Sequence, residues 1–155
     1  GDKMLFTGYI NDDERDMLYL IADVAVFPSL YEPFGIVALE SMAAGTPVVV
    51  SDSGGLAEIV EHEADGLHAI TGSANSLADQ LLRVLKNHLL AKKLRDNALR
   101  KVKSLYDWRV IANKTVEVYE TVTRENRVRQ QETGSLLWTA SRSKKFSHRH
   151  RGVIS

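Results

Sequence analysis

Short apolar runs alternate with longer segments in which apolar residues recur at helical spacing. The runs predict strands at residues 4–7, 24–27, 47–50 and 67–70. The longer segments predict helices at residues 11–22, 36–44, 56–63, 76–87, 89–105 and 108–123. Apolar residues at 24–27 are continuous rather than alternating, as in a parallel strand with both faces covered.

Local signals mark where several of these helices begin and end. Asn11 is followed three residues later by Glu14, which is a capping-box arrangement with Asn in place of Ser or Thr. Gly45, with Pro47 beyond it, ends the helix at 36–44. Strands and helices that alternate through short loops predict an α/β fold: a Rossmann-like parallel sheet flanked by helices, with a helical C-terminal end.

Two loops follow neighbouring strands of this predicted sheet, at residues 28–35 and 51–55. The carboxyl ends of parallel strands are where open α/β sheets bind their ligands. A helix that starts at Gly35 presents amides without intrahelical acceptors at the positive end of its dipole, which suits a phosphate. Gly54 and Gly55 offer a second stretch of open backbone. We therefore expect the two loops to clasp a diphosphate, although each glycine alone also fits a tight turn.

Two carboxylates accompany these loops. Glu40 lies just over one helical turn beyond Ile36, and a carboxylate can accept hydrogen bonds from adjacent hydroxyls such as those of a ribose. Glu32 lies in the loop, where it could stabilise positive charge on a sugar ring. The alternatives are that Glu32 is a loop surface charge and that Glu40 is an ordinary solvated helix residue.

Composition excludes several kinds of protein. The 155 residues form one domain or part of one, and they include no cysteine, so disulfides and cysteine-based metal sites are ruled out. No apolar run approaches the roughly 20 residues of a transmembrane helix, and the N-terminus does not resemble a signal peptide. We expect a cytoplasmic location and no bound metal. Nicotinamide-binding, P-loop and hydrolase-elbow motifs are also absent.

Residues 124–155 differ in charge from the rest of the chain. They contain eight of the 20 Lys and Arg residues but only two of the 20 Asp and Glu residues. The segment also lacks apolar periodicity, so it predicts a disordered basic tail. The alternative is a basic arm for nucleic acid or an anionic surface. No aromatic ladder accompanies the charges, and we therefore expect no nucleic-acid partner.

Residues 32–49, EPFGIVALESMAAGTPVV, closely resemble the signature of retaining glycosyltransferases with the two-domain GT-B fold. That family contains glycogen, starch and sucrose synthases and many mannosyl- and glucosyltransferases. Further matching features occur in the same order: Gly8-Tyr9-Ile10 before a helix, Gly54-Gly55-Leu56, Asp65-Gly66-Leu67 and Asp107-Trp108. The resemblance covers about residues 4–123 and leaves the basic tail outside.

The resemblance implies a nucleotide-sugar donor, a UDP- or ADP-sugar, and no bound metal or other cofactor. Glu32 matches the catalytic glutamate beside the donor sugar, and Glu40 matches the glutamate that holds the ribose. Tyr9 and Ile10 match the segment beside the base. The remaining donor-binding positions lie near the phosphates and are Phe34, Gly35, Ile36, Val37, Gly54, Gly55 and Leu56.

The resemblance also implies that parts are missing. In the family, two strands and an Arg/Lys pair precede the segment matched here, and a whole acceptor domain precedes those. We therefore expect residues 1–123 to be a partial nucleotide-sugar-binding domain that is inactive alone. In a longer chain it would transfer a hexose, with glucose favoured, to a glycan acceptor, as in glycogen and starch synthases. The alternative is a non-catalytic nucleotide-binding remnant or interaction module; an epimerase of the same fold ranks below both.

Overall fold

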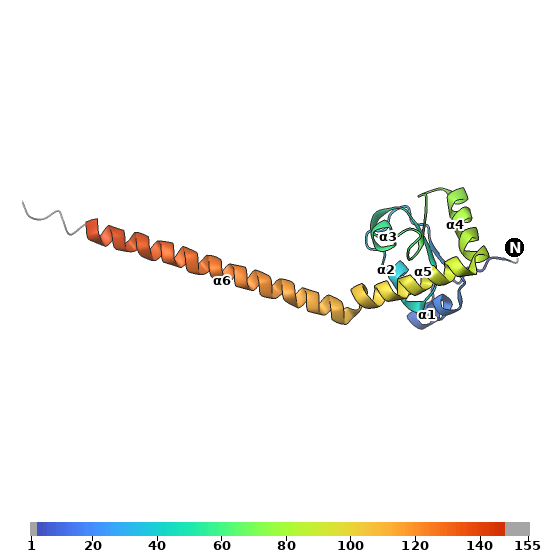
Figure 1. Cartoon of the computed structure of the whole chain (residues 1–155), viewed down its shortest axis with the longest axis horizontal. Coiled ribbons are helices and arrows are strands. Elements are labelled where there is room, and N and C mark those ends of the chain that lie inside the picture. Colours follow the sequence, from blue (N-terminus) through green and yellow to red (C-terminus); the bar gives the residue numbers. More distant parts are fainter. Residues whose placement is uncertain (1–2, 148–155) are drawn as a thin grey trace, which may run out of the picture. The chain divides into compact units, whose positions relative to one another are not determined.

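The computed structural model describes residues 3–147, with side chains described to residue 130. Contacts between residues divide the chain into two units, Gly1–Asp107 and Trp108–Ser155. The first unit holds the sheet and helices α1 to α5, and the second holds the single helix α6 (Figure 1). The division falls before the boundary at residue 123 that the sequence predicted, because side chains from residue 112 to 130 are exposed to solvent.

The sheet of the first unit has three parallel strands, in the order β1 (Ala25–Phe27), β2 (Val48–Ser51) and β3 (Leu67–Ala69). Val26 pairs with Val49, and Val50 pairs with His68. Crossover helices connect the strands, as parallel neighbours require. The predicted Rossmann-like α/β fold is confirmed.

Helices cover both faces of the central strand β2. Val48 and Val50 join a core cluster with residues of α2 (Ile36–Ala44) and α3 (Gly54–Ile59). Val49 points to the other face, into a cluster with Val84 of α4 (Ala74–Lys86) and Leu94 of α5 (His88–Lys101). All three valines are fully buried. This burial explains why the strand is apolar at every position.

Two predicted helix boundaries are confirmed and others are shifted. The helix expected at residues 56–63 is α3 (Gly54–Ile59), so the glycine pair expected in a loop forms the start of this helix. Asn11 and Glu14 form the capping box of α1 (Asp12–Ile21), and α2 lies between two left-handed glycines, Gly35 and Gly45. The helix expected from residue 76 begins instead at Ala74, where Ser73 is the cap. The Ser76 hydroxyl accepts the Ile70 amide at 2.9 Å, so it is engaged with the end of β3.

The strand predicted at residues 4–7 is wrong. The described chain is irregular there, and the side chains of Met4, Leu5 and Phe6 are 74–85% exposed. Within residues 3–147, β1 pairs only with β2. Residues 4–7 therefore have no neighbouring strand, and a short segment without a partner does not form a stable strand.

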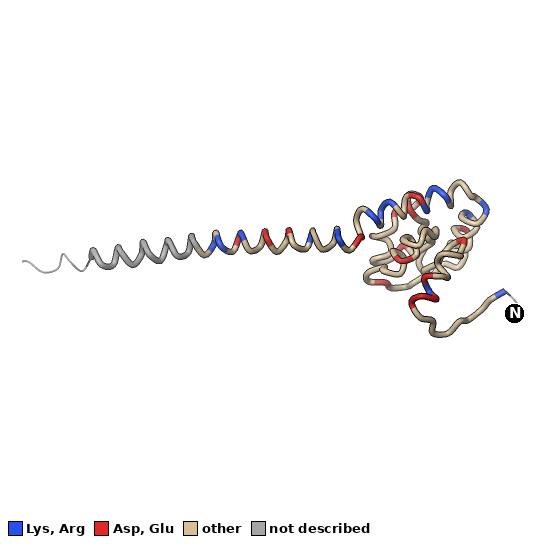
Figure 2. Tube along the Cα trace, turned by 90° about the horizontal axis from the view of Figure 1, so that it is seen from below, with Lys and Arg blue, Asp and Glu red and all other residues tan. Residues whose placement is uncertain are grey.

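The described part of the second unit forms the 40-residue helix α6 (Trp108–Ser147), which follows a π-helical segment, η1 (Val102–Tyr106), in the sequence. Residues 124–147, where the sequence predicted disorder, continue this helix. No proline follows Pro47, so none interrupts this helix. Basic and acidic residues are both spread along the described part of α6 (Figure 2). Residues 148–155 of the predicted tail lie outside the described residues. Within the described part, no helix is both long and apolar enough to cross a bilayer.

Candidate functional site

The loop after β1 is joined through its backbone to the start of α3, the helix that follows β2. The amide of Gly55 donates a hydrogen bond to the carbonyl of Glu32 at 2.7 Å. A Cβ added to Gly55 would lie 2.7 Å from the carbonyl oxygen of Pro33, and a Cβ on Gly54 would collide with the Glu32 carbonyl. Close approach of two backbones, rather than an open surface, explains the glycine pair.

Gly35 occupies the turn that opens α2. Its φ of 71° is in the left-handed region, and the residue is buried. An added Cβ would lie 3.0 Å from Cδ1 of Ile59 and 3.2 Å from the carbonyl oxygen of Gly55. The start of α2 is therefore fixed against α3, the helix that follows β2.

The amides at the start of α2 already attract an anion. One carboxylate oxygen of Glu32, Oε1, accepts the Phe34 amide at 3.3 Å and the Gly35 amide at 3.2 Å. Among the described residues, the amides of Ile36 and Val37 have no acceptor. The neighbouring side chain of Ile36 is 59% exposed, so this turn faces solvent. A negatively charged group is favoured at such a position by the helix dipole and the unpaired amides.

Glu40 lies just over one turn further along α2, and its side chain is 30% exposed. Its Oε2 lies 3.6 Å from Nε of Arg15, which comes from α1. Arg15 also forms ion pairs with Asp12 at 3.0 Å and Asp16 at 2.9 Å. The hydrogen bond to Asp16 raises the pKa of the Arg15 guanidinium, and the Glu40 carboxylate adds to this effect.

The structure brings some of the predicted residues together and separates others. Glu32, Gly35, Gly54 and Gly55 come together where the loop after β1 contacts the start of α3. The contacts of Glu40 are with α1, so the two glutamates bind different groups.

The other predicted positions differ widely in exposure. The side chain of Tyr9 is 96% exposed, Ile10 and Val37 are half-buried, and Phe34 is 71% exposed. Leu56 is fully buried in the core, so only its backbone is available to a ligand.

The sequence did not point to Arg15. It occurs in an acidic helical segment, where pairing with Asp12 and Asp16 is the obvious local reading. Its contact with Glu40, 25 positions later in the chain, depends on the packing of α1 against α2. No local pattern would have identified it.

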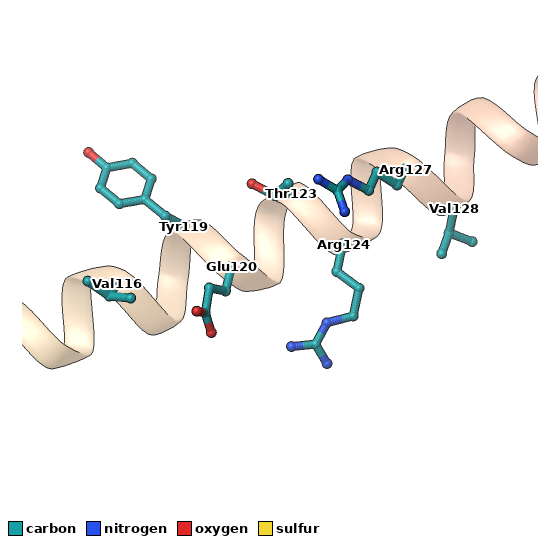
Figure 3. Close-up of a pocket in the computed structure, with 7 residues that line it drawn as sticks. All are labelled: Val116, Tyr119, Glu120, Thr123, Arg124, Arg127 and Val128. Carbon is teal, nitrogen blue, oxygen red and sulfur yellow. The ribbon is translucent and has the colours of Figure 1, made fainter.

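Neither a hollow on the surface of α6 nor a cluster of metal-ligating side chains provides a second site among the described residues. A shallow hollow on α6 is lined by Val116, Tyr119, Glu120, Thr123, Arg124, Arg127 and Val128 (Figure 3). All seven side chains project from one helix, so the hollow is a stretch of helix surface. Among the described residues, no three His, Asp or Glu side chains gather as a metal ion would require.

Sequence comparisons relate this chain to known proteins. A family model described as "Glycosyl transferases group 1" matches residues 1–101. An uncharacterized glycosyltransferase of Methanocaldococcus jannaschii is 48% identical over 118 residues, which are 76% of this chain and 30% of that protein. A glycogen synthase of Mycobacterium tuberculosis is 38% identical over 122 residues, which are 79% of this chain and 30% of that protein. The chain thus spans less than a third of the length of these two relatives.

Solved structures also resemble the chain. Sucrose-phosphate synthase from Thermosynechococcus elongatus has a TM-score of 0.74 and 39% identity, covering 80% of this chain and 31% of that one. HepE of Anabaena, solved in complex with UDP-glucose, has a TM-score of 0.63 and 28% identity. The match to HepE covers 67% of this chain and 29% of that one.

Proposed function

The chain belongs to the glycosyl transferases group 1 family, and on that basis we propose that it is the donor-binding part of a retaining hexosyltransferase. The donor is a nucleotide sugar, and the acceptor is a glycan bound by a part of the enzyme outside these residues. The alternative is a nucleotide-binding module that catalyses no transfer.

The observation that carries this proposal is the turn that opens α2. Its amides at Ile36 and Val37 have no acceptor among the described residues, and the helix dipole makes the position favourable for an anion. Glu40 follows on the same helix with a partly exposed carboxylate. A diphosphate on the turn and a ribose against Glu40 would use both features at once.

We assign the diphosphate to the amides of Ile36 and Val37. The amides of Phe34 and Gly35 are occupied by the Glu32 carboxylate in this structure. When the bond between the sugar and the diphosphate breaks, negative charge grows on the diphosphate. Backbone amides fixed at a helix N-terminus stabilise that charge without having to reorganise.

Glu32 is the proposed catalytic residue. Because its loop is fastened to Gly55 by a hydrogen bond of 2.7 Å, the side chain has a defined starting position next to the phosphate turn. A carboxylate there would stabilise the positive charge that develops on the sugar ring. Release of Oε1 from the two amides would free the side chain to face the sugar.

For the donor we favour UDP-glucose, with an ADP-sugar as the alternative. HepE was solved with UDP-glucose, and a glycogen synthase is among the relatives. Tyr9 and Ile10 would lie beside the base, while Gly54, Gly55 and the backbone of Leu56 would support the phosphate turn. The proposal includes no metal or other cofactor, and it places the enzyme in the cytoplasm.

Calorimetric titration of the chain with UDP and with ADP tests the proposal. One of the two should bind, and Glu40→Ala should weaken that binding by at least about tenfold, since hydrogen bonds to a charged acceptor are worth about 1.5–3 kcal/mol each. Glu117→Ala, which alters an exposed glutamate on α6, is the control and should bind as the unaltered chain does. Binding that does not depend on Glu40 would remove the ribose assignment.

A further inference from the structure

We propose that Arg15 is a positioning residue for Glu40, holding its carboxylate in the orientation that accepts the two ribose hydroxyls of the nucleotide. The inference rests on the proposed function, because it names the residue that prepares the same ribose site. Arg15 is on α1, and neither its position in the sequence nor its local charge pattern identified it with the site.

The Glu40 carboxylate can bind a ligand while it contacts Arg15. Nε of Arg15 lies 3.6 Å from Oε2 of Glu40, which is an ion pair rather than a short hydrogen bond. Among the described residues, no donor is hydrogen-bonded to Oε1 of Glu40. An ionised carboxylate offers about four acceptor positions, so contact with Arg15 leaves room for a pair of adjacent hydroxyls.

Arg15 is itself fixed before it meets Glu40. Its Nη1 donates to Asp12 at 3.0 Å, while Nε and Nη2 both donate to Oδ1 of Asp16, at 3.2 and 2.9 Å. A planar guanidinium whose three nitrogens are all engaged cannot turn freely, so its positive charge stays beside the Glu40 carboxylate, with Nε 3.6 Å from Oε2. The two side chains are 32% and 30% exposed, so water screens this pair less than a fully exposed one.

Helix α1 is anchored so that this alignment is maintained. The hydroxyl of Thr46 donates to the carbonyl of Tyr19. The ring of Tyr19 packs edge-on against Phe27 of β1, with the ring centroids 6.3 Å apart. Burial raises the pKa of the Tyr19 hydroxyl, and the nearby Glu40 carboxylate adds to this. Tyr19 and Arg15 therefore lie on the side of α1 that faces Glu40.

The acidic charge of α1 is a second reason why the proposed ribose site needs Arg15. It is the only basic residue of α1, whose other charged residues are Asp12, Asp13, Glu14 and Asp16. If Arg15 were removed, the Glu40 carboxylate would stand beside an acidic helix with no compensating cation from that helix. Its orientation would then be set by repulsion rather than by a defined contact.

The test compares nucleotides that differ only in the ribose hydroxyls. The unaltered chain, Arg15→Gln and Arg15→Lys are titrated calorimetrically with UDP and ADP, each beside its 2′,3′-dideoxy form, at about 0.15 M salt. Arg15→Gln should weaken the binding of the natural nucleotide by about fivefold, as expected for loss of one ion pair. The dideoxy form should change by less than about twofold, because the Debye length at this salt is about 8 Å. Arg15→Lys, which keeps the charge but loses the planar guanidinium held by Asp12 and Asp16, should restore part of the affinity.

Controls separate this inference from the proposed function and from loss of the fold. Lys92→Met removes an exposed ion pair on α5 and should bind both forms of the nucleotide unchanged. Equal weakening of the natural and dideoxy nucleotides by Arg15→Gln, or no weakening of either, would overturn the positioning role while nucleotide binding itself stands. If the unaltered chain binds neither UDP nor ADP, the proposed function is overturned and this inference with it.

Discussion

The carbonyl of Glu32 accepts the amide of Gly55 at 2.7 Å, and this bond joins the loop that follows β1 to the start of α3, the helix that follows β2. It places the proposed catalytic glutamate against the glycine pair and holds the turn that opens α2. The residues from Glu32 to Gly35 therefore do not form an independent loop. Their position depends on residues some twenty positions later in the chain.

Gly55→Ala should destabilise the chain by about 3 kcal/mol, because its Cβ would lie 2.7 Å from the Pro33 carbonyl oxygen. The clash is with backbone atoms, so it can be relieved only by a shift of the chain itself. Urea unfolding followed by circular dichroism measures the change. Gly8→Ala is the control: an added Cβ there meets no atom within 4 Å, so only its left-handed φ opposes the change. We expect a loss of about 1–2 kcal/mol for Gly8→Ala. Equal losses in the two variants would contradict the close contact between Gly55 and the loop after β1.

Lys101→Met should also cost about 3 kcal/mol of stability, since it leaves a buried carboxylate unpaired. Nζ of Lys101 lies 2.7 Å from Oδ2 of Asp65, and the two side chains are only 20% and 6% exposed. Lys92→Met removes an exposed ion pair with Asp96 and should cost less than about 1 kcal/mol. If the two variants unfold at the same urea concentration, the buried pair does not stabilise the fold as argued.

The pKa of Asp52 should rise in Thr71→Val. The Thr71 hydroxyl, followed by the Thr71 backbone amide, lowers that pKa through hydrogen bonds to Oδ1 of 2.6 and 2.8 Å. A carboxylate with a lowered folded-state pKa adds stability above its unfolded-state pKa and loses it as the pH falls through the folded-state value. The variant should therefore lose less stability in acid. NMR titration of the Asp52 carboxyl group measures the shift.

Glu63 provides an internal control for that titration. Its pKa is lowered by a hydrogen bond from Arg83, which Thr71→Val does not touch. The Glu63 midpoint should be the same in the variant and the unaltered chain. A shift of both residues together would indicate a general change in structure rather than the loss of one hydrogen bond.

These 155 residues alone should transfer no sugar. The chain spans 30% of the length of the Mycobacterium tuberculosis glycogen synthase, and we propose that the acceptor is bound outside the matched segment. An assay with radiolabelled UDP-glucose and a glycan acceptor measures transfer directly. Turnover above the rate of the Glu32→Gln variant would show that the chain is sufficient by itself.

The parts of the fold that could be predicted from the sequence are those whose signals are local. The bounds of α2 follow from Gly35 and Gly45, and the start of α1 follows from Asn11 and Glu14. The strand expected at residues 4–7 failed because a strand depends on a partner that its own sequence does not specify.

The same distinction applies to the site. Spacing along the chain predicted that Gly35 would open a helix and that Glu40 would lie on it, and α2 has both residues in those places. It could not indicate that Glu32 would bind the amides of Phe34 and Gly35. Nor could it indicate that Arg15 of α1 would contact Glu40 of the neighbouring helix α2. Those contacts depend on side-chain direction and on helix packing, which are set by the whole fold.

Backbone NMR provides the most direct measurement of the central claim, that the turn opening α2 binds the diphosphate of a nucleotide. The amide resonances of Ile36 and Val37 should shift on titration with UDP and remain in place with uridine, which has the same base and ribose but no phosphates. If UDP at saturation moves neither resonance, or if uridine moves them as far as UDP does, the account is contradicted.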